Sequence, residues 1–185
     1  MGDRRFEMED RKLQMMTLRR ASVDDVPLIR KIADVAFRLT YKDILSPEQM
    51  EYMMDWMYSE TSLRNQFETG HVFFIAQEGE KAVGYVSVEY QGNVDDVEVF
   101  HLQKLYLLPE YQKKGYGRKM FGKVVEYVRS QTGSAARIEL NVNRNNPSLS
   151  FYEHIGMKRL SQGDFPIGNG YFMNDYIMGF EVDRG

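Results

Sequence analysis

The sequence predicts an α/β fold, in which a mixed, mostly antiparallel and twisted sheet is flanked by helices. Residues 22–67 contain apolar side chains at helical spacing, whereas short segments rich in β-branched and aromatic residues begin at residue 71. The later part then alternates strand, helix, strand, helix and strand, with no repeat or linker. We therefore expect a single domain over residues 15–185, preceded by a polar leader at residues 1–14.

The N-terminal part is expected to hold one strand and three helices. Residues 15–20 form the short strand. Ser22 caps the first helix, because its hydroxyl can accept a hydrogen bond from a free backbone N–H at the helix start. Ser46 and Pro47 begin the second helix, because proline fits the first helical position. The third helix is short, over residues 62–67.

Strands dominate the remainder of the chain. We expect them over residues 71–76, 82–90, 97–108, 136–142, 157–160 and 171–182. The first two form a hairpin, and Pro109 ends the third because proline cannot donate a hydrogen bond to a sheet. Residues 92–96 are expected to form a loop. Helices are expected over residues 115–131, where apolar residues recur at helical spacing, and over residues 147–155.

Composition narrows the class of protein. The 185 residues include 24 basic and 27 acidic residues and no cysteine. The absence of cysteine excludes disulfides, thiolate metal sites and a cysteine nucleophile. A net charge of −3 argues against general nucleic-acid binding, and no run approaches the roughly 18 apolar residues of a membrane-spanning helix. We expect a cytoplasmic domain with no metal, nucleic-acid partner or membrane contact, and the sequence leaves a homodimer open.

Charge is unevenly distributed along the chain. Residues 103–129 hold seven basic and two acidic residues, a net charge of +5. Two stretches lack lysine and arginine: residues 43–63 hold five acids and residues 82–103 hold four. This pattern suggests an anionic ligand near the basic segment and a cationic ligand near the acidic ones. Solvated helix faces and a loop are the alternative explanation.

A glycine-bearing turn at residues 112–117 precedes the helix expected from residue 115. It fails the dinucleotide-binding pattern, because Met120 stands where glycine is required, and the P-loop pattern, because Val124 lacks the hydroxyl that holds Mg²⁺. Glycines here still let backbone N–H groups converge at a helix N-terminus, which attracts phosphate oxygens. An ordinary helix start is the alternative. The cationic side chains nearby are Lys113, Lys114 and Arg118.

Two motifs resemble those of a known family. Residues 105–117, LYLLPEYQKKGYG, resemble the acetyl-CoA signature of the GNAT (Gcn5-related) N-acetyltransferases. Residues 145–157, which contain Asn-Asn-Pro, Phe-Tyr-Glu and Gly-Met, resemble the second signature of the family. The order of elements also agrees over roughly residues 17–182, and the chain is most similar to bacterial PaiA-type polyamine acetyltransferases. Ser148 and Met157 depart mildly from the family pattern.

The resemblance implies the acyl-CoA N-acyltransferase (GNAT) fold and acetyl-CoA as co-substrate. An amine would attack the thioester directly, without a covalent enzyme intermediate. The pantetheine arm would lie along the strand that ends near Leu108, and the pyrophosphate would rest on the glycine turn. The implied cofactor-binding residues are Leu105, Tyr106, Leu107, Gln112, Lys113, Lys114, Gly115, Tyr116, Gly117 and Arg118. The family asparagine falls on Asn145 or Asn146, depending on the direction of counting, so both are carried over.

The resemblance also implies two catalytic residues. Tyr152 would be the general acid that protonates the departing thiolate; packing in the core is the alternative role. His101 stands where one branch of the family has a glutamate base, and an imidazole suits that role near neutral pH. Its alternative is a side chain that merely points to solvent. Tyr41, Asp55 and Trp56 are expected to wall a closed acceptor pocket.

Three functions are consistent with these features. The first is acetylation of a small-molecule amine, with a polyamine as the leading substrate. The second is a binding module that holds acyl-CoA without turnover, and the third is acetylation of a protein N-terminus or lysine. Tyr152 favours an enzyme, and an aromatic and acidic acceptor side favours a small amine over a protein.

Overall fold

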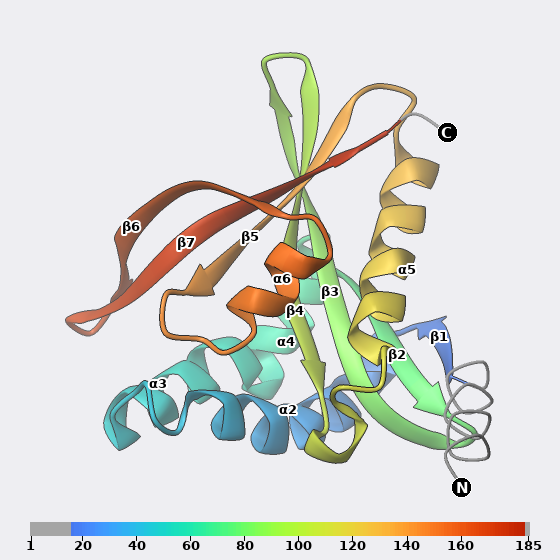
Figure 1. Cartoon of the computed structure of the whole chain (residues 1–185). Coiled ribbons are helices and arrows are strands. Elements are labelled where there is room, and N and C mark those ends of the chain that lie inside the picture. The colour runs from blue at the N-terminus through green and yellow to red at the C-terminus, as the bar shows by residue number, and fades with distance from the viewer. Residues whose placement is uncertain (1–15, 184–185) are drawn as a thin grey trace, which may run out of the picture.

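Residues 16–183 are described in the computed structural model of the chain, and within them seven strands form one sheet in the order β1-β2-β3-β4-β5-β7-β6 (Figure 1). The strands are β1 (Met16–Arg20), β2 (Val72–Glu78), β3 (Lys81–Val94), β4 (Val97–Leu107), β5 (Ala136–Asn143), β6 (Lys158–Gly168) and β7 (Tyr171–Val182). Neighbours are antiparallel except β4 and β5, which are parallel. The mixed, mostly antiparallel sheet is therefore confirmed, whereas the predicted leader lies outside the described residues.

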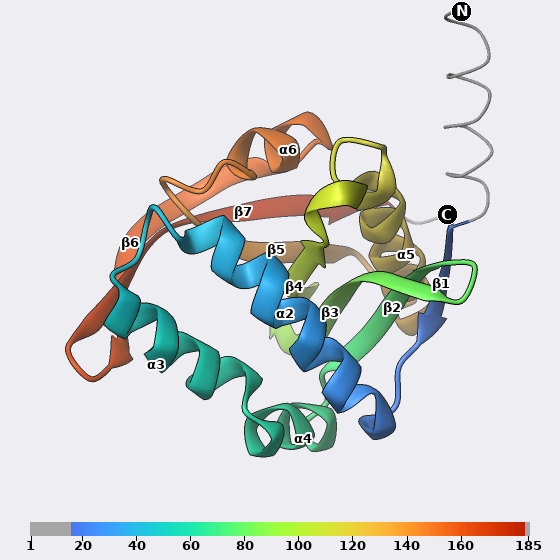
Figure 2. The ribbon, with the colours of Figure 1, turned by 90° about the horizontal axis from the view of Figure 1, so that it is seen from below.

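Helices cover both faces of this sheet (Figure 2). The α-helices are α2 (Val26–Tyr41), α3 (Pro47–Tyr58), α4 (Glu60–Glu68), α5 (Tyr116–Gln131) and α6 (Leu149–His154), and 3-10 turns η1 (Val23–Asp25) and η2 (Pro109–Tyr111) precede α2 and α5. A core under α5 and α6 includes Met120 and Leu140, and a second core under α2, α3 and α4 includes Phe37 and Tyr85. These two cores bury the apolar residues that the helical spacing predicted.

Serine caps begin the first two helical segments as the sequence predicted, although Ser22 caps the 3-10 turn η1 that leads into α2 and not α2 itself. The hydroxyls of Ser22 and Ser46 accept hydrogen bonds from backbone N–H groups two and three residues later, at 3.3 and 3.1 Å. Ser59 caps α4 in the same way. Because this cap precedes the expected start, α4 begins at Glu60 rather than at residue 62.

A β-bulge in β4 determines which side chains reach each face. Val88 pairs with Leu102 and Ser87 with Lys104, so Gln103 is an extra residue. The extra residue reverses the alternation of side chains. Leu102 and Leu105 therefore both join the core under α5, whereas Lys104 lies over the rings of Tyr58 and Phe73 in the core under α2.

Strands β4 and β5 pair over only four residues. Their parallel register runs from Glu98–Ala136 to His101–Glu139 and then stops. Beyond His101, β4 has no partner on this side within the described chain, and the two strands part (Figure 1). The backbone groups that residues 102–107 of β4 direct toward this side are therefore left facing the gap.

Two stretches differ from the sequence prediction. The loop expected at residues 92–96 is only a tight turn at Asp95–Asp96, because β3 continues to Val94. The strand expected at residues 157–160 extends to Gly168 as β6. Pro166 is tolerated there because β6 is the edge of the sheet, where one side of the strand needs no donors.

Candidate active site

A cavity of about 810 Å³ occupies the gap between β4 and β5. Its walls come from β4, the turn before α5, β5, α6 and the end of α2. The cavity therefore reaches from the glycine turn on the α5 side to the aromatic core on the α2 side. Its volume is in the range of pockets that enclose a small organic ligand.

The glycine turn forms one end of the cavity. Gly115 has a left-handed conformation, with φ of 81°, and lies directly before the first turn of α5. Gly117 brings α5 close to α6, since a Cβ there would lie 3.1 Å from the Phe151 ring. No side chain of the described residues caps this helix end. Its backbone N–H groups therefore face a site suited to phosphate.

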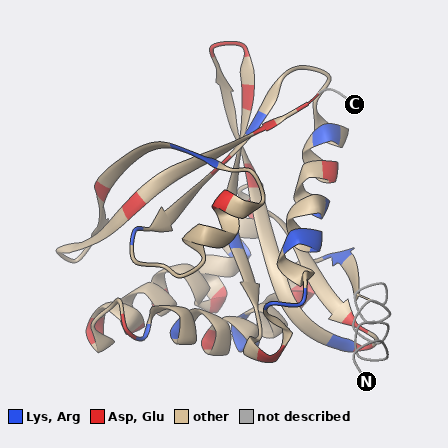
Figure 3. Ribbon diagram, in the orientation of Figure 1, with Lys and Arg blue, Asp and Glu red and all other residues tan. Residues whose placement is uncertain are grey.

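The basic residues of the turn divide into two groups. Lys113 and Arg118 line the cavity, whereas Lys114 lies over the ring of Tyr111, 5.5 Å from its centroid. Figure 3 shows the blue segment of this turn between β4 and α5. Tyr116 does not contribute its side chain to the cavity, because the ring is buried in the sheet core and its hydroxyl donates to Glu78. Only its backbone lies at the helix start.

The free edge of β4 forms the long wall. Leu105, Tyr106 and Leu107 all line the cavity, as does Gln112. The Gln112 side-chain amide donates to the Leu107 carbonyl at 3.2 Å, so this glutamine holds the turn against the strand. An extended ligand arm could therefore pair with β4 as an additional strand would.

Tyr152 lies in α6 where the cavity meets the α2 side. The residue is 9% exposed. Burial, together with the neighbouring Tyr41, raises the pKa of Tyr152 above the ordinary tyrosine value. The phenol is therefore protonated at neutral pH and can donate a proton.

Asn146, rather than Asn145, faces the cavity. Its Oδ1 accepts from the Ser148 N–H at 2.8 Å, and its Nδ2 donates to the Tyr41 hydroxyl at 3.3 Å. The Asn145 side chain does not line the cavity; its backbone N–H donates to Asn143 Oδ1. Asn146 thus ties the start of α6 to the end of α2.

Of the three predicted acceptor residues, Tyr41 alone lines this cavity. Asp55 lines a separate cavity of about 390 Å³ between α2 and α3. Trp56 is 48% exposed and stacks on Tyr52. The structure does not bring Asp55 and Trp56 to this cavity, because residues such as Met53 form the buried face of α3 and these two residues lie elsewhere on the helix.

The acidic residues of the two stretches are also not all gathered at one site. The second stretch passes through the turn between β3 and β4, where Asp95 and Asp96 lie. Figures 1 and 3 show this acidic hairpin tip at the top of the molecule and α3 at the lower left. Asp95 and Asp96 therefore do not share a cation site with the acids of α3.

His101 lies at the point where β4 and β5 part. Its Nε2–H donates to Asn141 Oδ1 at 3.1 Å, which leaves Nδ1 as the unprotonated nitrogen of the neutral ring. Burial lowers the pKa of His101, and Nδ1 is buried without a hydrogen-bond partner within residues 16–183. His101 does not line the cavity itself, but Asn141 does. The hydrogen bond between His101 and Asn141 therefore connects His101 to a residue of the cavity wall.

Lys104 and Asn141 are cavity residues that the sequence did not single out. Lys104 is buried, and its Nζ donates to Gln66 Oε1 at 2.7 Å. Burial lowers the pKa of Lys104 to about 8. The sequence shows Lys104 only as part of a basic segment, because the bulge that turns it inward is a property of strand pairing. Asn141 carries no motif.

Comparisons with known proteins agree with this geometry. The Acetyltransferase (GNAT) family model matches residues 31–157. The chain is 27% identical over 154 residues to the uncharacterized N-acetyltransferase YuaI of Bacillus subtilis, covering 83% of this chain and 86% of that protein. It is 24% identical over 146 residues to a spermidine N(1)-acetyltransferase of Thermoplasma acidophilum, covering 76% and 87%.

Solved structures show the same fold. The crystal structure of PaiA N-acetyltransferase from Thermoplasma acidophilum in complex with coenzyme A matches with a TM-score of 0.69 and 25% identity, covering 89% of this chain and 97% of that one. Within residues 16–183, no helix is long and apolar enough to cross a membrane. The PaiA-like resemblance is confirmed, and the chain belongs to the GNAT family of acetyl-CoA-dependent N-acetyltransferases.

Proposed function

We propose that this protein transfers the acetyl group of acetyl-CoA to a primary amine of a small molecule, with polyamines as the acceptor class. The amine attacks the thioester directly within a ternary complex. The observation that carries the proposal is the single cavity in which the glycine turn, the free edge of β4 and Tyr152 meet. A thioester supplies the activated acetyl group; the remaining requirements are binding, orientation and proton transfer by this chain.

The cofactor side of the cavity suits coenzyme A. Backbone N–H groups at Gly115 and Gly117, with Lys113 and Arg118 beside them, provide the charge and the close approach that a pyrophosphate requires. The unpaired edge of β4 suits the amide groups of a pantetheine arm. Tyr152, which lies near Tyr106 of this edge and near Tyr41, would protonate the departing thiolate.

The attacking amine must lose a proton. An amine with a pKa of ~10.4 is only about 0.04% free base at pH 7. We assign His101 as the proton acceptor: its Nε2–H is held by Asn141 Oδ1, and Nδ1 is the nitrogen that takes the proton. Its lowered pKa keeps the ring neutral, and so able to accept a proton, throughout the neutral range.

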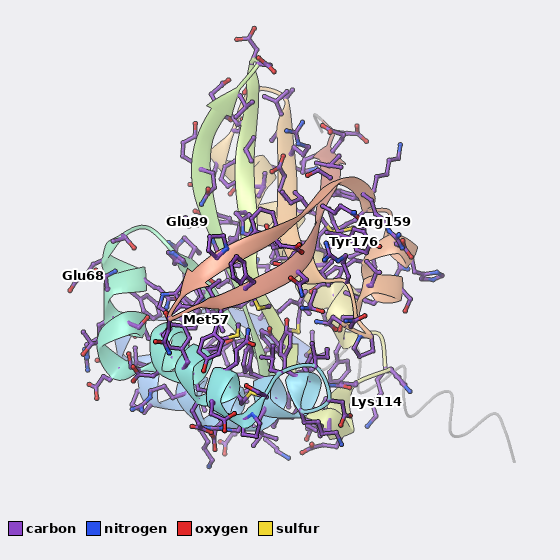
Figure 4. The ribbon with its side chains drawn as sticks, turned by 90° about the vertical axis from the view of Figure 1, so that its left-hand side faces the viewer. Met57, Glu68, Glu89, Lys114, Arg159 and Tyr176 are labelled. Carbon is purple, nitrogen blue, oxygen red and sulfur yellow. The ribbon has the colours of Figure 1, made fainter. Side chains whose placement is uncertain are left out.

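The acceptor side supports a small substrate over a protein. The Tyr52 hydroxyl donates to the Ile167 carbonyl at 2.7 Å, and Gln49 Nε2 donates to the Phe172 carbonyl at 3.2 Å. These bonds tie α3 to the β6–β7 hairpin, which lies across the sheet beside α3 in Figure 4. An extended peptide would have to break them, whereas a small amine would not. The polyamine class is supported by the Thermoplasma acidophilum relative named for spermidine.

A thiol-release assay with acetyl-CoA and a panel of amines tests the proposal. We expect spermidine and spermine to give a kcat/KM at least about tenfold above butylamine and above a peptide with a free N-terminus. Acetyl-CoA binding without thiol release for any amine would instead indicate a binding module. Preferential acetylation of peptides would indicate a protein acetyltransferase.

The role of His101 has its own signature in pH. We expect His101→Ala to lower kcat by about 10²–10⁴ at pH 7, because the general base is lost. The deficit should shrink toward pH 9, since the amine then loses its proton to solvent more readily. Coenzyme A affinity, measured by calorimetry, should be unchanged. A ratio of wild-type to variant kcat that stays constant over pH 6–9 would contradict this role.

A further inference from the structure

Asp175 is a buried carboxylate that forms no salt bridge within residues 16–183. It lies in β7, is 5% exposed and pairs in register with Asn143 of β5. Its Oδ1 has no hydrogen-bond partner within residues 16–183, and its Oδ2 accepts one long bond of 3.4 Å from Asn141 Nδ2. A buried carboxylate in this state is costly for the protein, because it has lost water and gained little in return.

Neighbouring carboxylates are satisfied, which sets Asp175 apart. Arg137 donates to Glu139 at 2.7 Å. Arg144, whose charge acts on Asp175 and lowers its pKa, donates at 2.6 Å to Asp164. The Arg144 guanidinium is therefore paired with Asp164 and not with Asp175. Burial is the larger influence on Asp175 and raises its pKa.

Asp175 lies behind the α2 end of the cavity, where the acceptor is proposed to bind, rather than behind the glycine turn. Side chains along β7 alternate between the two faces of the sheet, so Asp175 is on the same face as Met173. Met173 packs in the core under α2. Asp175 is linked to two cavity residues: Asn141, through the hydrogen bond, and Tyr41, whose pKa its charge helps to raise. Both line the cavity.

The carboxylate also determines how Asn141 is oriented. An ionised carboxylate only accepts hydrogen bonds, so the amide Nδ2 of Asn141 must face Asp175. Its Oδ1 is then turned toward His101, from which it accepts one hydrogen bond, and within residues 16–183 no second donor contacts this oxygen. A negative charge behind this amide makes that oxygen a stronger acceptor for a cation.

We propose that Asp175 and Asn141 form the subsite that recognises the ammonium group of the acceptor. Asn141 Oδ1 contacts the ammonium, and Asp175 acts through Asn141 as a positioning residue that supplies the opposing charge. This inference rests on the proposed function and names the chemistry of its acceptor site: a protonated primary amine, with no recognition of a neutral alcohol of the same length.

Asp175→Asn tests the subsite because it removes the charge and keeps the shape. We expect KM for spermidine to rise at least about tenfold, because an interaction with an ionised group is lost, while kcat stays within about threefold. Coenzyme A affinity should be unchanged. Glu181→Gln is the matched control: it removes an exposed carboxylate from the same strand, and its kinetics should equal those of the wild type.

Binding without turnover gives an independent readout. Spermidine should raise the melting temperature of the complex of wild-type protein with coenzyme A, and octanediol should not. This increase should vanish in Asp175→Asn and in Asn141→Leu, which removes Oδ1 and leaves the carboxylate in place. The ligand-free Asp175→Asn protein should be at least as stable as the wild type, because an unpaired buried charge is removed.

The outcomes are distinct. Unchanged KM and an unchanged spermidine-induced shift in both variants would overturn the subsite, as would an equal stabilisation by octanediol. A ligand-free Asp175→Asn protein that melts well below the wild type would show that the carboxylate has a structural role instead. If the wild type acetylates no amine, the proposed function fails, while the melting experiment still decides whether this ammonium subsite exists.

Discussion

Replacing Tyr152 by phenylalanine is expected to lower kcat by about 10²–10⁴ with little change in coenzyme A affinity. The substitution deletes one hydroxyl from a side chain that is 9% exposed, so the packing of α6 is kept. Burial keeps the pKa of this phenol above its ordinary value, so the wild-type hydroxyl is protonated through neutral pH. Without it, the thiolate must leave unprotonated or take a proton from water.

A second tyrosine provides the control for this experiment. Tyr127 is partly buried in α5, packs against Phe74 and does not line the cavity. Tyr127→Phe should retain wild-type kcat. If Tyr152→Phe also stays within about threefold of the wild-type rate, then Tyr152 serves only to pack the core.

Gly117→Glu and Gly115→Glu are each expected to weaken acetyl-CoA binding by at least about 100-fold. A glutamate places a negative charge where the pyrophosphate is expected. At Gly117 the new Cβ would also lie 3.1 Å from the Phe151 ring. At Gly115 the glutamate would have to adopt the left-handed backbone conformation, with a φ of 81°. Titration calorimetry measures the loss, and in the wild type the affinity should fall as salt rises.

Gly122 provides the control, because a glutamate there adds the same charge at a position away from the cavity. Gly122 lies in α5, and a Cβ there would meet nothing within 4 Å. Gly122→Glu therefore adds the same side chain to the same helix, outside the cavity, and should bind acetyl-CoA as the wild type does. Retained binding in both folded turn variants would remove the assignment of this turn to the cofactor.

The elements could be predicted where local chemistry decides them. Ser22 and Ser46 cap helices because a hydroxyl satisfies free N–H groups wherever such a helix begins. The prediction failed for β6, where glycines and Pro166 suggest a loop. Only the position of this strand at the sheet edge, which depends on every other strand, makes proline acceptable there.

The residues of the site also fall into two groups: those that a local motif predicts and those that only strand pairing brings together. The glycine turn and Tyr152 each belong to a motif of residues that are close together in the sequence. Both line the cavity. Asp55 was expected to face the acceptor and instead lines a separate cavity, since acidity along the chain does not reveal which side of a helix is buried. Asn141 and Asp175 were missed because each is an isolated polar residue in a strand, and their pairing joins β5 to β7.

The sequence by itself determined the family, the helix caps and the glycine turn before α5, since each depends on residues close together along the chain. The tertiary structure decided the rest. The bulge at Gln103 turns Lys104 inward, the parting of β4 and β5 beyond His101 opens the cavity, and strand pairing brings Asp175 behind Asn141. Each of these depends on the register between strands, which is fixed by packing across the whole sheet and not by any local pattern.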